Sequence, residues 1–472
     1  MKKLIEIGKI RPLGKNDEKN ARFGIGLEKL DRNVFDPSKT YDRLADIGMK
    51  YVRLQSGWMR TEKEEGIYDF AWLDEIVDNL VSRGMEPWLC LCYGNPVYTE
   101  SAKKYFGAVG CPPVFTEREK RGWANYCSAL AGHYKGRIKM FEVWNEPDGD
   151  HCWKHGTNGK EYGEFCIDTA KAIRKTYPEA KILGCSTCDR EKGFTWIEPA
   201  MQTGMFRYVD AITYHEYTVD ETQIFERVSA LKAVCAKYGN LGLIQGENGC
   251  PSSGDGFGAL NTGAFTPQKQ AKLILRRQIV DMLSGVEFSS VFTTVDMIEA
   301  LHGTVGDKSS YLDYGFFGLL AAEFDENGRS IGEYKPKPSY YAFQNLCAVF
   351  GKDIVLSEVP VFFFPTMSPA LFAREEERKN LLTAGFCNRK NGGLAFVYWK
   401  PAQLLSTSFE GTISFQASGF TDAVLTDLLT GAIYRIPEEM REDLGCGVTL
   451  FKHVPVKDYP LIISSANFME KE

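Results

Sequence analysis

The sequence predicts an α/β protein consisting of a (β/α)8 TIM barrel and a C-terminal all-β sandwich. From about residue 20 to 350, short apolar segments of strand length alternate with longer segments that have helical spacing of apolar residues. After residue 348 this pattern gives way to short alternating segments separated by turn-forming residues. We expect an N-terminal strand that joins the sandwich in 1–18, the barrel in 19–348 and the sandwich in 349–472.

Eight segments of the first part have the composition of buried parallel strands, and helical segments separate them. Between the second and third of these strands, Leu73, Ile76, Val77 and Leu80 share one helical face, and Gly84 follows. Eight strands with intervening helices predict a closed barrel. The strands are expected at 23–27, 51–54, 87–93, 140–146, 182–186, 211–215, 241–247 and 288–294, with further helices at 40–49, 117–134, 163–177 and 267–283.

The second part has no long helical period. Its strand-like segments are short, and turn-forming residues separate them, which favours a β-sandwich. The Leu- and Ile-rich segment 3–11 is expected to add a strand to it. The other strands are expected at 381–386, 394–399, 411–416, 423–426, 432–435, 448–451 and 461–464.

Charge and composition exclude several classes of partner. The 472 residues include 56 Lys and Arg and 62 Asp and Glu, a net charge of −6 without a basic block, so a nucleic-acid partner is not expected. No apolar stretch approaches 18 residues, so no membrane-spanning segment is expected. The first residues lack a signal-peptide pattern. The oligomeric state stays open, and a homo-oligomer is compatible with the sequence.

The cysteines favour a reducing compartment. There are 13, an odd number, and Cys90, Cys92 and Cys185 lie in apolar strand-like segments, which suits free thiols in the cytoplasm. Cys185 and Cys188 have the spacing of a metal-binding pair, but no second pair or nearby His cluster accompanies them. We therefore predict a cytoplasmic protein without a metal or organic cofactor.

Two glutamates follow strand-like segments and are the candidate catalytic residues. Trp144-Asn145-Glu146-Pro147 closes the segment 140–146, and Glu247 closes the segment 241–247 before a loop rich in Gly, Cys, Pro and Ser. In a parallel barrel, catalytic groups lie at the C-terminal ends of strands. Cleavage of a glycosidic bond needs two carboxyl groups, one to protonate the leaving oxygen and one to attack the anomeric carbon or to activate water. For a retaining enzyme, the two pKa values must also be held apart.

These two motifs resemble the fourth and seventh strands of the retaining glycoside hydrolases of clan A. Later segments are similar to the β-xylosidase/α-L-iduronidase family in particular: 292–296, 314–320 and 337–343. The resemblance implies that Glu146 is the acid/base, that Glu247 is the nucleophile, and that Asn145 binds the sugar 2-hydroxyl. It spans about residues 20–350.

The resemblance also implies a set of substrate-binding residues. Arg53 matches an arginine that lies near the nucleophile, and His215 and Tyr217 match a His-x-Tyr pair on the sixth strand. From their positions at strand ends or barrel rims, Asn95, Trp58 and Trp153 are further candidate sugar contacts. The chain departs from the family in its eighth strand, where only Phe292 can serve as the aromatic platform.

The predicted function is a retaining glycoside hydrolase that cleaves short glycosides, β-xylosidase-like or a related β-glycosidase. The long segments 149–160 and 298–312 favour exo action. A transglycosylase that uses the same pair is an alternative. A sugar-binding protein with a non-hydrolytic barrel is another, and the intact carboxylate pair argues against it. An aldolase- or enolase-type barrel would need a Schiff-base lysine or metal-binding acids at strand ends.

Overall fold

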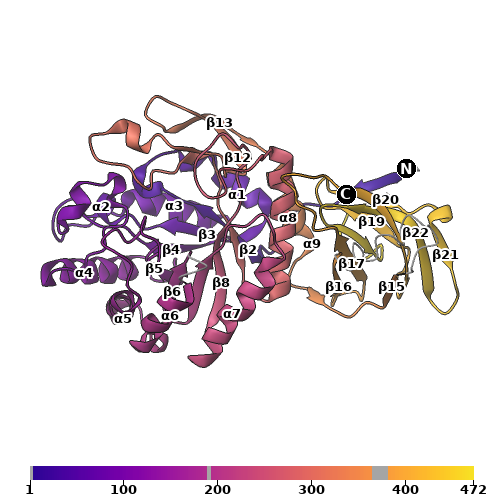
Figure 1. Ribbon diagram of the computed structural model, residues 1–472, viewed down its shortest axis with the longest axis horizontal. Coiled ribbons are helices and arrows are strands. Elements are labelled where there is room, and N and C mark those ends of the chain that lie inside the picture. Colours follow the sequence, from indigo (N-terminus) through magenta and orange to yellow (C-terminus); the bar gives the residue numbers. More distant parts are fainter. Residues whose placement is uncertain (1–3, 189–192, 364–380) are drawn as a thin grey trace.

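A computed structural model of the chain describes residues 4–188, 193–363 and 381–472. Its first part is a closed barrel of eight parallel strands, with helices around the outside and the second part at one side (Figure 1). This confirms the predicted fold class. The barrel strands are β2 (Asn20–Leu27), β3 (Met49–Gln55), β4 (Glu86–Leu91), β5 (Met140–Val143), β6 (Lys181–Thr187), β7 (Ala211–His215), β8 (Gly242–Asn248) and β9 (Ser289–Val291).

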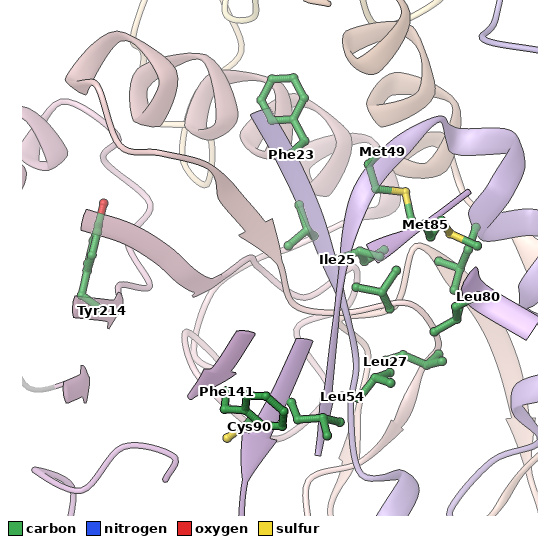
Figure 2. Packing of buried hydrophobic residues seen from close by; sticks show 14 of the residues in the cluster. Phe23, Ile25, Leu27, Met49, Leu54, Leu80, Met85, Cys90, Phe141 and Tyr214 are labelled. Carbon is green, nitrogen blue, oxygen red and sulfur yellow. The ribbon is translucent and has the colours of Figure 1, made fainter. Parts of the chain in front are cut away.

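Helices connect the strands and cover their outer faces. Apolar side chains from the strands and helices form one large cluster, and Figure 2 shows part of it, including Phe23, Leu27, Met49 and Leu80. Each of these four side chains is almost fully buried. The helices are α1 (Tyr41–Ile47), α2 (Trp58–Thr61), α3 (Ala71–Ser82), α4 (Glu117–His133), α5 (Gly159–Thr176), α6 (Gly193–Gln202), α7 (Gln223–Lys237), α8 (Pro267–Ser284) and α9 (Pro338–Val349).

The interior of the barrel is layered along its axis. An apolar cluster fills the end at which the strands begin, where Tyr51 and Trp88 pack against Phe288. Side chains alternate between the two faces of a strand, so the next inward-facing residue is two positions further on. At that level Arg53 on β3 meets Glu142 on β5. A charged layer therefore lies above an apolar floor, toward the C-terminal ends of the strands.

Two small antiparallel pairs extend the chain between β9 and α9. They are β10 (Met297–Ile298) with β11 (Tyr314–Gly315), and β12 (Leu320–Phe324) with β13 (Ser330–Pro336). Val295 and Leu320 form a bridge at the start of this segment. These additions bring residues 299–317 over the C-terminal ends of the barrel strands.

The second part consists of two antiparallel sheets. A seven-stranded sheet has the order β1-β20-β19-β23-β17-β16-β14, and a four-stranded sheet has the order β15-β18-β22-β21. Strand β1 pairs with β20, which brings the N-terminal segment beside the C-terminal part of the chain (Figure 1). The strands are β1 (Ile5–Lys9), β14 (Ile354–Leu356), β15 (Val361–Phe363), β16 (Leu382–Asn388), β17 (Leu394–Trp399), β18 (Glu410–Ser418), β19 (Val424–Asp427), β20 (Ala432–Arg435), β21 (Arg441–Asp443), β22 (Val448–Lys457) and β23 (Leu461–Ser464).

Buried charges join the sheets to the barrel. Arg276 on α8 donates to both carboxylate oxygens of Glu221, and the indole of Trp399 on β17 donates to the same carboxylate at 2.9 Å. Lys272 on α8 pairs with Asp458 at 2.7 Å. Helix α8 therefore contacts the second part of the chain through specific polar side chains as well as through apolar packing.

Two further findings bear on the sequence expectations. Among the residues that the structure describes, no helix has both the length and the apolarity that a membrane crossing requires. The thirteen cysteines are all free thiols, and ten of them are buried.

Candidate active site

A cavity of about 730 Å³ opens at the C-terminal ends of the barrel strands. Its volume lies within the range that is usual for small-molecule sites. Five of the residues predicted from the sequence line it: Asn145, Glu146, Tyr217, Glu247 and Phe292. The structure thus brings residues from four different strand ends to one hollow.

Glu146 stands on a turn just beyond the end of β5. Strand β5 ends at Val143, and both Trp144 (φ 70°) and Glu146 (φ 46°) adopt the left-handed backbone region, which residues other than glycine rarely occupy. The Trp144 indole donates to the carbonyl of Cys152 at 2.8 Å and so holds the loop that follows. Residues with backbone strain of this type cluster at functional sites, and here two of them lie within three positions.

Two imidazoles contact the Glu146 carboxylate. His215 Nδ1 lies 2.8 Å from Oε1, and His151 Nε2 is hydrogen-bonded to Oε2. Burial disfavours the charged carboxylate, but the hydrogen bonds from His151 and His215 outweigh it and lower the pKa of Glu146. Cys152 and Glu146 together raise the pKa of His151 well above its usual value, against the effect of burial. In this structure Glu146 is therefore held ionised.

Glu247 lies within β8 and contacts fixed donors. Arg53 Nη1 donates to Oε2 at 2.9 Å, and the Tyr217 hydroxyl donates to Oε1 at 2.5 Å. Burial, together with the nearby Glu247 charge, raises the pKa of Tyr217 well above its usual value, so its hydroxyl stays a donor. Both oxygens of the carboxylate are thus satisfied by the protein.

Arg53 connects this carboxylate to three other residues. Its guanidinium donates to Glu142 at 2.6 and 2.8 Å, to Asn145 at 2.8 Å and to Glu28 at 3.1 Å. Burial raises the pKa of Glu28 to about 7 even though Arg53 opposes the shift. A single buried guanidinium therefore positions Glu247 and Asn145 at the same time.

The two candidate carboxyl groups lie close together. An oxygen of Glu146, a ring nitrogen of His215 and an oxygen of Glu247 all lie within 4.8 Å of one another. His215 Nδ1 is 2.8 Å from Glu146 and 3.7 Å from Glu247. Burial by itself would lower the pKa of His215, but the charge of Glu247 and the hydrogen bond to Glu146 outweigh burial and raise this pKa above its usual value. The two carboxylates therefore lie side by side in the wall of one cavity.

The remaining lining combines aromatic and charged side chains. Phe292 and Phe317 pack edge to face at 5.5 Å, and each also packs against Tyr217. Lys29 Nζ pairs with Glu299 at 2.9 Å and lies 5.1 Å above the Phe292 ring. An apolar face beside such polar groups suits a sugar, which has apolar C–H surfaces and hydroxyl groups.

Comparison with known proteins agrees with this geometry. Residues 28–239 match the profile of Glycosyl hydrolases family 39. A beta-xylosidase of Geobacillus stearothermophilus is 23% identical over 425 residues, which cover 81% of this chain and 74% of that protein. The chain is a glycoside hydrolase, and its residues 28–239 resemble family 39. The predicted resemblance to the clan A β-xylosidase family is thereby confirmed.

Solved structures agree with the barrel of this glycoside hydrolase. A family 39 glycoside hydrolase from Bacteroides cellulosilyticus WH2 superposes with a TM-score of 0.65 at 15% identity, covering 96% of this chain and 82% of that one. A monomeric beta-xylosidase from Caulobacter crescentus CB15 gives a TM-score of 0.61 at 16% identity, covering 98% and 97%. At these identities the likeness concerns the fold.

Three predicted sugar contacts of the hydrolase lie away from the cavity. Trp58 is fully buried, donates to Glu62 at 2.5 Å and stacks on Tyr98. Trp153 is also fully buried, and its indole donates to Glu161 at 2.9 Å. Asn95 donates to the carbonyl of Glu62 at 2.8 Å. None of these three lines the cavity, because each has its polar group satisfied inside the protein.

Three residues beside the carboxylates do not line the cavity. Asn248, which follows Glu247, donates to Ser289 and to the carbonyl of Ser290, and so joins β8 to β9. Arg53 and His215 contact the carboxylates but lie beneath the cavity rather than on its surface. Their position fits groups that hold the carboxylates rather than the sugar.

Sequence reasoning missed several residues of the hydrolase site. The sequence has six histidines. The feature that could have singled out His151 is its position in a rim loop, five residues after Glu146. Lys29 and Glu299 come from opposite ends of the barrel sequence, so only the closure of the barrel joins them. Within the part of the chain that the structure describes, two sets of groups have the spacing of a metal site, Glu146 with His151 and Cys152, and Glu146 with His215 and Glu247.

Proposed function

We propose that this protein is a retaining, exo-acting β-glycosidase of the β-xylosidase type, with Glu247 as the nucleophile and Glu146 as the acid/base. The observation that carries the proposal is the separation of the two carboxylates, whose oxygens approach within 4.8 Å. Retaining enzymes hold their carboxyl groups about 5–5.5 Å apart, whereas inverting enzymes leave room for a water.

In the first step Glu247 attacks the anomeric carbon and Glu146 protonates the leaving oxygen. Arg53 and Tyr217 orient the attacking carboxylate, because each donates to a different oxygen. Asn145, fixed by Arg53 at 2.8 Å, is placed to bind the neighbouring sugar hydroxyl. The bond to the leaving group breaks as the bond to Glu247 forms.

The first step requires a proton on Glu146, whose pKa the hydrogen bonds from His151 and His215 lower. His151 and His215 both contact this carboxylate and so form a local store of that proton. When the glycosidic oxygen enters beside Glu146, the carboxyl group needs to exchange its imidazole contact for this oxygen. In the second step Glu146 removes a proton from water, which then releases the sugar from Glu247.

The form of the site supports exo action on short glycosides. The cavity is bounded by residues of the segments after β8 and β9, including Phe257, Leu301 and His302. Such walls favour a chain end over the interior of a polymer. Xylose is the first candidate sugar because the relative from Geobacillus stearothermophilus is a beta-xylosidase.

The test is hydrolysis of a panel of aryl β- and α-glycosides by the wild type and by Glu247→Gln. We expect release of the aryl group from one or a few β-glycosides and loss of release in the variant. Proton NMR of the sugar first released then reports the anomer. A first product of inverted configuration, or undiminished turnover by Glu247→Gln, would refute the proposal.

The same assay separates the two alternatives. Addition of excess acceptor sugar would give a new disaccharide as the main product if the protein is a transglycosylase. Saturable binding of a sugar without any turnover would indicate the sugar-binding alternative. Either result would replace hydrolysis as the function of the site.

A further inference from the structure

The first of the two candidate metal sets gathers three different ligand types beside the cavity. An oxygen of Glu146, a ring nitrogen of His151 and the sulfur of Cys152 lie within 4.8 Å of one another. The second set, Glu146 with His215 and Glu247, has the Arg53 guanidinium 2.9 Å from Glu247. That permanent positive charge opposes a second cation, so the first set is the better candidate.

The sulfur of Cys152 has unusual surroundings for a buried thiol. Asn145 Nδ2 points at it from 3.4 Å, and the Tyr93 hydroxyl lies 3.5 Å away. The Tyr93 oxygen already accepts a hydrogen bond from Asn145 at 3.0 Å, which leaves its own hydrogen free to point at the sulfur. Two donors aimed at one sulfur stabilise a thiolate, and partners of this kind also tune metal ligands.

The loop that carries His151 and Cys152 is held in place. Lys154 Nζ binds the carbonyls of His151, Val109 and Leu301 at 2.7, 3.0 and 3.0 Å. The Trp144 indole binds the carbonyl of Cys152. Both ligand-bearing residues are therefore anchored through their backbones, which lowers the cost of arranging them around an ion.

The set is also reachable from solvent. Glu146 and His151 line the cavity, and the His151 side chain keeps 27% of its surface exposed. An ion that enters the cavity meets the hydrogen bond between these two groups first. Cys152 lies behind them, next to Asn145.

We propose that Glu146, His151 and Cys152 bind one thiophilic divalent cation of the zinc class and that this ion reversibly switches off hydrolysis. Imidazole, thiolate and carboxylate are the usual ligands of Zn²⁺, and a three-residue set leaves a fourth position for water. On binding, the hydrogen between His151 and Glu146 and the hydrogen of the thiol both pass to solvent. Inhibition rests on the proposed role of Glu146, whereas binding does not.

Binding is tested with Cd²⁺ alone, whose bond to a thiolate gives an ultraviolet charge-transfer band. The experiment uses the full chain with Cys387→Ser and Cys446→Ser, since these thiols are half-buried and exposed. We expect the absorbance of this band to saturate at one Cd²⁺ per protein chain. We expect no band in Cys152→Ser or in His151→Asn. Cys188→Ser is the matched control, because this thiol also lines the cavity and lies outside the set.

The outcomes separate this inference from the proposed function. If the band persists in Cys152→Ser, or if only Cys188→Ser removes it, the proposed metal site is refuted. This holds whether or not the protein hydrolyses glycosides. With an active enzyme, Zn²⁺ should reduce the rate at least tenfold, and a chelator should restore it. The half-inhibitory concentration should rise about 10–100-fold in Cys152→Ser and in His151→Asn, each compared with its own metal-free rate. Cd²⁺ binding with unchanged hydrolysis overturns the switch.

Discussion

The two carboxylates of the site lie in different electrostatic surroundings. Glu247 contacts Arg53, which is fully buried and whose charge is permanent. Glu146 contacts His151 and His215, and an imidazole, unlike a guanidinium, is able to give up its proton. A nucleophile has to remain ionised, and an acid/base has to change its protonation state. The difference between the two regions therefore matches the two proposed roles.

The backbone differs between the two regions as well. Glu247 lies within β8, which pairs with β7 and β9 in the barrel wall, although the register of both pairings shifts beside it. Glu146 lies beyond the end of β5 on a turn with left-handed residues, and His151 is on the same loop. One carboxylate is thus fixed by the barrel wall, whereas the other depends on a rim loop.

Removing the permanent charge should have the largest effect. Arg53→Met leaves Glu28, Glu142 and Glu247 without their shared cation, and breaking a buried ion pair costs about 3–5 kcal/mol. We expect a loss of this size in the free energy of unfolding, measured by denaturant titration, and loss of hydrolysis. Arg276→Met is the control, since it breaks the buried pair with Glu221 away from the cavity. Equal loss of activity per folded molecule in both variants would contradict the comparison.

Glu146→Gln should reduce hydrolysis in a way that depends on the leaving group. General acid catalysis contributes about 10²–10⁴-fold, so glycosides with poor leaving groups should lose this much, and dinitrophenyl glycosides far less in the first step. Azide should restore turnover and give a glycosyl azide of retained configuration. Steady-state kinetics on both substrate types measure this. A uniform loss over all leaving groups would assign Glu146 another role.

His151→Asn should shift the pH dependence of kcat/KM. The hydrogen bond from His151 lowers the pKa of Glu146, so replacing it with a neutral group should raise this pKa. The protonated acid then persists to higher pH, and the alkaline limb should move up by about 1–3 pH units. His155→Asn is the control, because His155 lies on the same loop and binds Glu161. An unchanged or lowered alkaline limb in His151→Asn would show that the titratable partner is not His151.

Trp58→Phe should have the smallest effect on activity. Trp58 is fully buried and binds Glu62, so the variant loses about 1.5–3 kcal/mol of stability and keeps its KM within about twofold. Tyr217→Phe removes a donor from Glu247 and should instead change kcat. Thermal unfolding and steady-state kinetics distinguish the two. A large rise in KM for Trp58→Phe would place this residue back in the sugar site.

The sequence by itself determined the fold class and the positions of Glu146 and Glu247 at the ends of two strand-like segments. These follow from local signals, because strand and helix periodicity and the ends of apolar segments can be read along the chain. The resemblance added Arg53, Asn145 and Tyr217. In the structure Arg53 and Tyr217 contact Glu247, and Asn145 contacts Arg53.

Tertiary structure decided which polar and aromatic residues face the cavity. Trp58, Trp153 and Asn95 have the composition of sugar contacts, yet each finds its partner inside the protein. Lys29 meets Glu299 only because the barrel closes its first strand against its last. Side-chain direction and closure depend on contacts between distant segments, and a linear sequence does not record these contacts.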